Sequence, residues 1–173
     1  DVGVPLVAHK DVRLITMTGS TPAGKKIMAA ASETLKEVRL ELGGKAPFMV
    51  MEDADLDKAA DAAVAARFGN GGQVCTSNER TYIHEAIYDR FVQKIREKIE
   101  ALKVGLPTDP DTDMGPKVSE DELNKVHAMV ENAIRQGARL AMGGKRLRGG
   151  VYDQGYFYAP TLLTDVTQDM DVV

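Results

Sequence analysis

The spacing of hydrophobic positions alternates between short apolar runs, typical of buried strands, and a period of three to four residues, typical of helices. A helix is predicted over residues 21–32, with Thr21 as its N-cap and Pro22 at the first helical position, where a missing N–H costs nothing. Apolar runs before and after it predict strands at residues 13–17, 37–42 and 47–51. This strand–helix–strand order predicts an α/β fold.

The remaining residues predict longer helices separated by turns. An Ala-rich helix with an acidic first turn, which suits the helix dipole, is predicted over 53–68. Apolar side chains on one face predict an amphipathic helix over 86–103, and Ser119 with Glu122 forms a capping box for a helix to Gln136. A polar loop is predicted at 107–116, and further strands at residues 81–84, 140–142, 156–158 and 161–163.

Composition narrows the class of protein. The chain has 173 residues, of which 43% are hydrophobic, enough to bury a core. Its net charge is −4 with both signs mixed along the chain, so no basic patch indicates nucleic acid. The apolar runs are too short to span a bilayer, and residues 1–9 lack the layout of a signal peptide. We therefore expect neither nucleic acid nor a membrane as a partner.

The chemistry-bearing side chains are few. A single cysteine excludes an internal disulfide, suits a reducing compartment and predicts a cytoplasmic protein. The three histidines, His9, His84 and His127, show no ligand spacing, so we expect no metal site. Four methionines stand where core residues are expected, namely Met49, Met51, Met129 and Met142.

Small residues between the first strand and helix form a turn, Gly19-Ser20-Thr21-Pro22-Ala23-Gly24. They would let a phosphate approach the backbone at a helix N-terminus, where free N–H groups favour an anion. The turn lacks the three-glycine dinucleotide fingerprint, and a tight, well-capped turn is the alternative interpretation.

Glu41 ends an apolar strand beside the pair Gly43 and Gly44. With little bulk around it, its carboxylate could swing toward a substrate, and desolvation would make it a general base near neutral pH. The alternative is an edge glutamate that pairs with Lys45.

Cys75 lies in a glycine-rich turn, residues 69–77. A turn offers access to the thiol and backbone N–H groups that stabilise a thiolate or an oxyanion. The alternative is a buried and inert cysteine. A Cys–His pair with His84 is also conceivable, although His84 more simply ends a strand.

Together these segments resemble the aldehyde dehydrogenase superfamily over essentially the whole chain. Four motifs carry the resemblance: Met17-Thr18-Gly19-Ser20-Thr21 with Gly24, Leu40-Glu41-Leu42-Gly43-Gly44-Lys45, Gly72-Gln73-Val74-Cys75 and Met114-Gly115-Pro116. The distance of 34 residues from Glu41 to Cys75 is also usual in that family.

The resemblance implies that residues 1–42 end a Rossmann-like coenzyme domain and that residues 43–173 form most of an α/β catalytic domain. It implies oxidation of a small aldehyde to a free acid with NAD or NADP. Cys75 would attack the aldehyde, and Glu41 would activate the water that hydrolyses the thioester.

The resemblance also assigns cofactor residues and places the chain within a longer protein. Gly19, Ser20 and Gly24 would border the pyrophosphate, and the backbone of Leu42 would touch the nicotinamide amide. The chain begins without Met and ends without a polar tail, so we expect an internal piece of a longer protein. The resemblance implies that this piece is inactive alone and that the complete enzyme is a homodimer or homotetramer.

Two other functions remain open at this point. A relative kept for structure or ligand binding would tolerate loss of Glu41 or Cys75, and both are present. A cysteine hydrolase using Cys75 and a histidine would act without a nicotinamide cofactor.

The sequence around Cys75 resembles bacterial enzymes that act on lactaldehyde, glycolaldehyde or semialdehydes.

Overall fold

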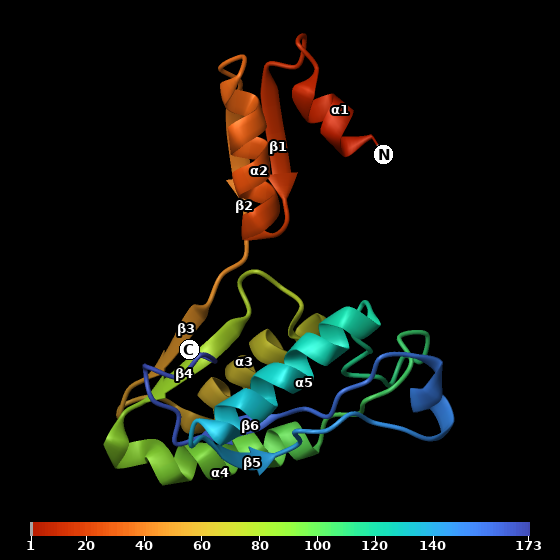
Figure 1. Ribbon diagram of the computed structural model, residues 1–173. Helices are drawn as coiled ribbons and strands as arrows, with labels where there is room; N and C mark the ends of the chain where they lie inside the picture. Colours follow the sequence, from red (N-terminus) through yellow and green to blue (C-terminus); the bar gives the residue numbers. More distant parts are fainter. Residues whose placement is uncertain (1) are drawn as a thin grey trace. The chain divides into compact units, whose positions relative to one another are not determined.

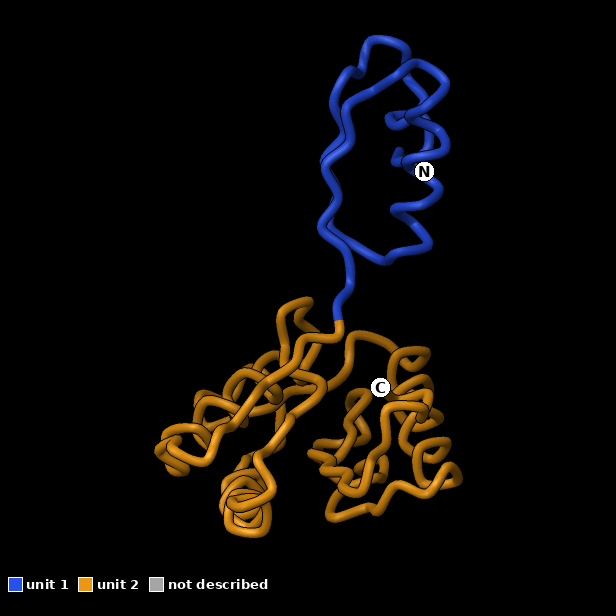
Figure 2. The backbone as a smooth tube through the Cα atoms, turned by 90° about the vertical axis from the view of Figure 1, so that its left-hand side faces the viewer, with its two compact units in different colours: residues 1–44 blue, residues 45–173 orange. Residues whose placement is uncertain are grey.

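The computed structural model describes residues 2–173, which form two compact units that divide between Gly44 and Lys45 (Figure 2). The predicted division, after residue 42, lies two residues earlier. Assigning the units to coenzyme binding and catalysis stays a prediction.

The smaller unit is a strand–helix–strand motif preceded by a short helix (Figure 1). Its strands β1 and β2 are parallel, with Thr18 opposite Glu41, and α2 packs on them. A Cβ atom at Gly24 would come within 2.9 Å of the Leu42 side chain, so glycine is what lets α2 lie this close to β2. The elements are α1 (Gly3–Ala8), β1 (Leu14–Thr18), α2 (Thr21–Ser32) and β2 (Glu37–Glu41).

The larger unit begins with two parallel strands and two helices that share its main core. Phe91 and Val50 are completely enclosed there, together with alanines of α3. The alanine-rich surface of α3 lets α4 approach closely, and the apolar face of α4 supplies Phe91, Ile95 and Ile99. The elements are β3 (Ala46–Val50), α3 (Leu56–Phe68), η1 (Gly69–Gly72), β4 (Asn78–Ile83), η2 (Glu85–Ile87) and α4 (Tyr88–Glu100).

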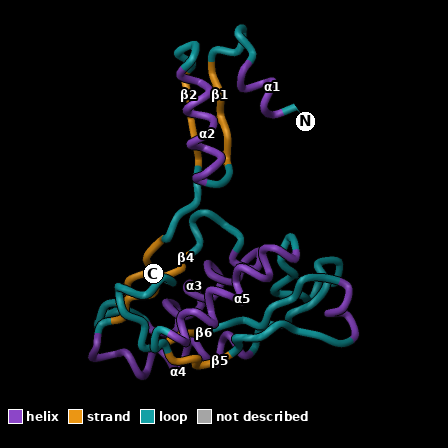
Figure 3. Tube along the Cα trace, viewed as in Figure 1, coloured by secondary structure: helices purple, strands orange, loops and turns teal. Residues whose placement is uncertain are grey.

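A long loop, residues 101–119, leads to the second part of this unit (Figure 3). There Leu123 and Val130 of α5 pack with Tyr158, and Ala133 packs with Ala138 and Met170. Strands β5 and β6 pair in antiparallel fashion. The elements are α5 (Glu120–Arg135), β5 (Arg139–Met142), η3 (Gly150–Gln154) and β6 (Leu162–Thr164).

The predicted α/β class is confirmed, and several details are corrected. Ser20, not Thr21, caps α2, since its extended backbone lets its Oγ accept from Ala23 N. Asp55 caps α3, so the acidic segment before it is a turn. Ser119 accepts from Glu122 N as predicted, but the Glu122 carboxylate pairs with Lys125, which leaves the capping box half formed.

Two further predictions were wrong. Residues 156–158 form no strand, because Tyr156 bridges to Lys117 while Tyr158 bridges to Arg146. Three methionines expected in the core are exposed, with Met49 at 71%, Met51 at 58% and Met129 at 44%. Only Met142 packs against the core as predicted.

Candidate functional site

Cys75 lies in the turn between α3 and β4, residues 69–77, called the cysteine turn below. The turn opens with three consecutive residues in the left-handed region: Asn70 at φ 51°, Gly71 at 64° and Gly72 at 74°. A Cβ at Gly72 would come within 2.9 Å of the Arg67 carbonyl oxygen. Glycine is therefore needed there for both its conformation and its size.

Ser77 ties the second half of the turn to the end of α3. Its side chain is 2% exposed, and its hydroxyl donates to the Ala66 carbonyl at 2.9 Å while accepting from Arg67 Nη1 at 3.2 Å. The next residue, Asn78, donates to the Ala63 carbonyl at 3.2 Å. The Ser77 bond satisfies a carbonyl at the helix C-terminus, and the two residues together fix the start of β4 against α3.

The first half of the turn is tied to residues 116–118, which follow the predicted Met114-Gly115-Pro116 landmark. Gln73 Nε2 donates to the carbonyls of Asn70 at 2.9 Å and Pro116 at 3.4 Å. Gln73 Oε1 accepts from Val118 N at 2.9 Å. Lys117 Nζ donates to the Gly71 carbonyl. The turn is thus bonded at both ends.

Between these two attachments Cys75 is exposed, with a free thiol. The expectation of an accessible cysteine is confirmed, and the alternative of a buried one is wrong, while the reactivity of the thiol stays a prediction. His84, considered as a partner for the thiol, uses Nδ1 to accept from Ala86 N at the start of η2. His127 lies 3.1 Å from the Tyr158 hydroxyl.

Lys117 is a partly buried charged group whose side chain contacts the turn at Gly71. Burial lowers the pKa of its ammonium below the usual value, and the positive charge of Arg67 lowers it further, while Glu122 acts in the opposite direction. A lysine in this position loses solvation, so its bond to the Gly71 carbonyl replaces hydration that water would otherwise supply.

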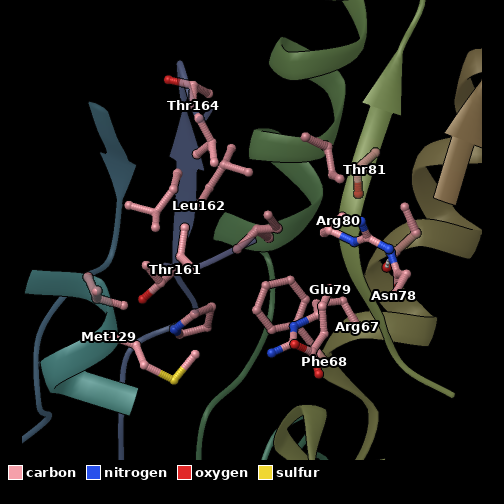
Figure 4. A pocket seen from close by; sticks show the side chains of 18 of the residues that line it. Arg67, Phe68, Asn78, Glu79, Arg80, Thr81, Met129, Thr161, Leu162 and Thr164 are labelled. Carbon is pink, nitrogen blue, oxygen red and sulfur yellow. Dashed lines mark hydrogen bonds between the residues drawn. The ribbon is translucent and has the colours of Figure 1, made fainter. Parts of the chain in front are cut away.

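A cavity of about 370 Å³ lies within the larger unit (Figure 4), and Gly71 of the cysteine turn is one of the residues that line it. Arg67 and Asn78 line one side of it, and Met129, Thr161 and Leu162 line the other. Asn78 is 7% exposed, and its Oδ1 has no hydrogen-bond partner among the residues described. Cys75 is not among the lining residues, so this cavity is not where its thiol would meet a substrate.

In the smaller unit, the predicted cofactor residues and Glu41 gather where the two parallel strands end. Gly19 N donates to the Glu41 carbonyl at 2.9 Å, and Ser20 begins α2. Leu42 lies on Gly24, as described above. The carboxyl ends of parallel strands are where α/β sheets bind nucleotides, and Ser20 stands at a helix N-terminus. These residues therefore fit a nucleotide cofactor.

Several of these residues also have local structural roles. Gly24 permits helix packing, Ser20 caps α2, and the Gly19 amide is already bonded to the backbone. Glu41 itself is exposed. Lys45, the ion-pair partner considered for Glu41, forms its ion pair with Glu79 at 3.0 Å instead.

Comparison with known proteins decides the family. The sequence profile described as "Aldehyde dehydrogenase family" matches residues 1–173. The chain belongs to the aldehyde dehydrogenase family. A curated member, 3,6-anhydro-alpha-L-galactose dehydrogenase from Vibrio sp. (strain EJY3), is 50% identical over 99% of this chain and 36% of the relative.

Solved structures of the family agree with this fold. 3,6-Anhydro-L-galactose dehydrogenase in complex with NAP has a TM-score of 0.96 and 51% identity, covering 99% of this chain and 36% of that one. Lactaldehyde dehydrogenase from Escherichia coli has a TM-score of 0.94 and 45% identity, covering 99% and 35%. The predicted aldehyde dehydrogenase-like α/β fold is confirmed, and the chain spans about a third of these relatives' length.

None of the helices within residues 2–173 combines the length and hydrophobicity that a membrane crossing requires. Over the same residues, no three or more His, Cys, Asp or Glu side chains cluster as metal ligands would.

Proposed function

We propose that the protein carrying this chain is a cytoplasmic NAD(P)-dependent aldehyde dehydrogenase with Cys75 as its nucleophile. The observation that supports this most is the exposed thiol of Cys75, the only cysteine, on a turn bonded at both ends. A fixed and accessible thiol is what covalent attack on a carbonyl requires. Family membership supplies the class of reaction.

In the proposed reaction, the Cys75 thiolate attacks the aldehyde carbon and forms a thiohemiacetal. The backbone N–H of Cys75 helps to stabilise its oxyanion. NAD(P), when bound, supplies the hydride acceptor, and the thiohemiacetal is thereby oxidised to a thioester. Gly19, Ser20, Gly24 and the Leu42 backbone would hold the cofactor at the strand ends of the smaller unit.

Glu41 would complete the cycle as the general base. Its carboxylate takes a proton from water as the water attacks the thioester, which releases a free carboxylic acid and the Cys75 thiol. The exposed position of Glu41 beside Gly43 supports this role, because a base that must approach a water needs room to move.

We propose an aldehyde with a hydroxyl group next to the carbonyl as the substrate class. Two relatives are named for lactaldehyde and for 3,6-anhydrogalactose, and both compounds have that group. A structure named succinate-semialdehyde dehydrogenase is 40% identical, so a semialdehyde is the second candidate. The complete enzyme would act as a homodimer or homotetramer, which light scattering of the full-length protein would test.

The test is an assay of the full-length protein with lactaldehyde, glycolaldehyde and succinate semialdehyde, each with NAD and with NADP. We expect one reduced cofactor and one acid for each aldehyde consumed, with hydroxyaldehydes preferred. Absence of aldehyde-dependent cofactor reduction would overturn the proposal. Ester or thioester hydrolysis that needs no cofactor would favour the cysteine hydrolase.

A further inference from the structure

The surroundings of Lys117 disfavour the charged form of its side chain. It is drawn out of water and toward the like charge of Arg67, and both effects lower its pKa. Groups held against their own solvation in this way cluster at functional sites. A stability role alone would be served as well by an apolar side chain of similar length.

The contacts of Lys117 lead to the cysteine turn. Its backbone N–H donates to the Tyr156 carbonyl at 2.9 Å, which fixes its main chain. Its side chain donates to the carbonyl of Gly71 across 46 residues of sequence. A Cβ added at Gly71 would come within 3.9 Å of Lys117 Nζ and 3.7 Å of the Gly115 carbonyl, so the segment lies directly against the turn.

Gln73 makes a second connection between the same two segments. Its amide bonds to Asn70 within the turn and to both Pro116 and Val118 outside it. The two connections lie on either side of residues 70–72, which have left-handed backbone conformations. Two of these residues are glycines, so without the connections this backbone would have many accessible conformations. Together they restrict the backbone that leads directly to Cys75.

We propose that Lys117 is a positioning residue for Cys75: its bond to the Gly71 carbonyl, with the Gln73 bridge, holds the cysteine turn in one conformation with the thiol presented. The catalytic consequence rests on the function proposed above. A displacement of a reacting group by about 1 Å can cost roughly a hundredfold in rate, so loss of this bond should slow the chemistry.

The first measurement is hydrogen exchange of the backbone amides at 70–78, which requires no enzyme activity. In Lys117→Met we expect exchange at Gln73 to accelerate about tenfold or more, while α4 exchanges as in the parent. Lys58→Met is the matched control, because Lys58 is an exposed lysine of α3 whose ammonium pairs with Asp55. It should leave residues 70–78 unchanged.

The second measurement is steady-state kinetics of the full-length enzyme. Lys117→Met should lower kcat by roughly ten- to a hundredfold with the KM for the cofactor unchanged. Lys117→Arg keeps a positive charge and N–H donors, and it should lose less than about threefold. If Lys117→Met does not fold, Gln73→Met removes the neighbouring bridge and should show the same pair of effects.

Unchanged exchange at 70–78 in a folded Lys117→Met would overturn the proposal. If that variant does not fold, unchanged exchange in Gln73→Met would overturn it. Faster exchange with an unchanged kcat would also overturn it, because Lys117 would then stabilise the turn without positioning the thiol. If the parent protein reduces no cofactor with any aldehyde, the proposed function fails by itself. The exchange experiment still decides whether Lys117 holds the turn.

Discussion

The cysteine turn and the segment around Glu41 have very different surroundings. The turn has three residues in the left-handed region and side-chain bonds from Gln73, Ser77 and Lys117. Glu41 is exposed at a strand end, and among the described residues nothing lies within 4 Å of a Cβ placed on Gly43. The cysteine motif and the glutamate motif are both specific in sequence, but contacts from other residues restrain the first far more than the second.

This contrast matches the two proposed roles. A nucleophile gains from a fixed position, because its attack must be aligned before the reaction begins. A base that acts on a later water molecule gains from freedom to approach after the thioester has formed. Each prediction below changes one side of the comparison.

The largest effect is expected from Cys75→Ala, which removes the group that the turn presents. Aldehyde-dependent cofactor reduction by the full-length enzyme should fall by more than about 10³-fold. NAD binding, measured by calorimetry, should persist, and Cys75→Ser should be as inactive as Cys75→Ala. Residual turnover within about tenfold of the parent would exclude Cys75 as nucleophile.

Glu41→Gln changes the exposed side of the comparison. The amide keeps the shape of the carboxylate but takes no proton from water, so steady-state turnover should fall by about 10²-fold or more. Stopped-flow should still show a burst of reduced cofactor, followed by a slow phase as thioester accumulates. The matched control is Glu37→Gln on the same strand, whose carboxylate pairs with Arg39 at 2.7 Å. Loss of the burst would mean that Glu41 acts before hydride transfer.

A pair of glycine substitutions compares the two backbones directly. Gly72→Ala places a side chain at positive φ, close to the Arg67 carbonyl, and should cost about 1–3 kcal/mol of unfolding free energy. Gly43→Ala meets no neighbour among the residues described and should cost less than about 0.5 kcal/mol. Urea unfolding of both variants is the measurement. Equal losses would show that the turn is no more constrained than the glutamate segment.

The smallest expected effect is a loss of stability at alkaline pH, which arises in the larger unit from Tyr158. Burial raises the pKa of Tyr158 to about 12, with a further rise from Glu131 and an opposing effect of Arg146. A raised folded-state pKa gives stability that is present below pH 10 and lost as pH rises toward 12. The loss from this residue should be about 1 kcal/mol between pH 9 and pH 11.

The Tyr158→Phe variant tests both the raised pKa and the loss of stability that it predicts. Absorbance of the phenolate at alkaline pH should lose a step near 12 in the variant, and the stability of the variant should decline less between pH 9 and pH 11. An ionisation of Tyr158 near 10 would contradict the structure, because a hydroxyl on a side chain only 4% exposed should resist ionisation.

Local patterns predicted most of the fold because strands and helices are specified by short-range periodicity. Their ends were less accurate, since either Ser20 or Thr21 can accept a capping bond and only the backbone conformation decides between them. The false strand at 156–158 has a different cause. Its residues bond to Lys117 and to Arg146, which are distant in sequence.

The candidate site was predictable only in part, for the same reason. Cys75 stood out as the single cysteine in a glycine-rich turn, but the sequence left a buried cysteine open and only the structure shows that Cys75 is exposed. Lys117 and Ser77 carry no signal of their own, because their contacts depend on tertiary packing. The Met114-Gly115-Pro116 landmark directly before Lys117 was the one pointer that could have directed attention to it.

The distance in sequence between the cysteine turn and its partner segment also sets an order of events during synthesis. Lys117 follows Gly71 by 46 residues, and ribosomes add about 5–20 residues per second. The Gly71 carbonyl is therefore made about 2–9 s before the Lys117 side chain that donates to it. During that interval the bonds from residues 116–118 to the turn cannot yet form, so the turn takes its final form only after the later segment has been added.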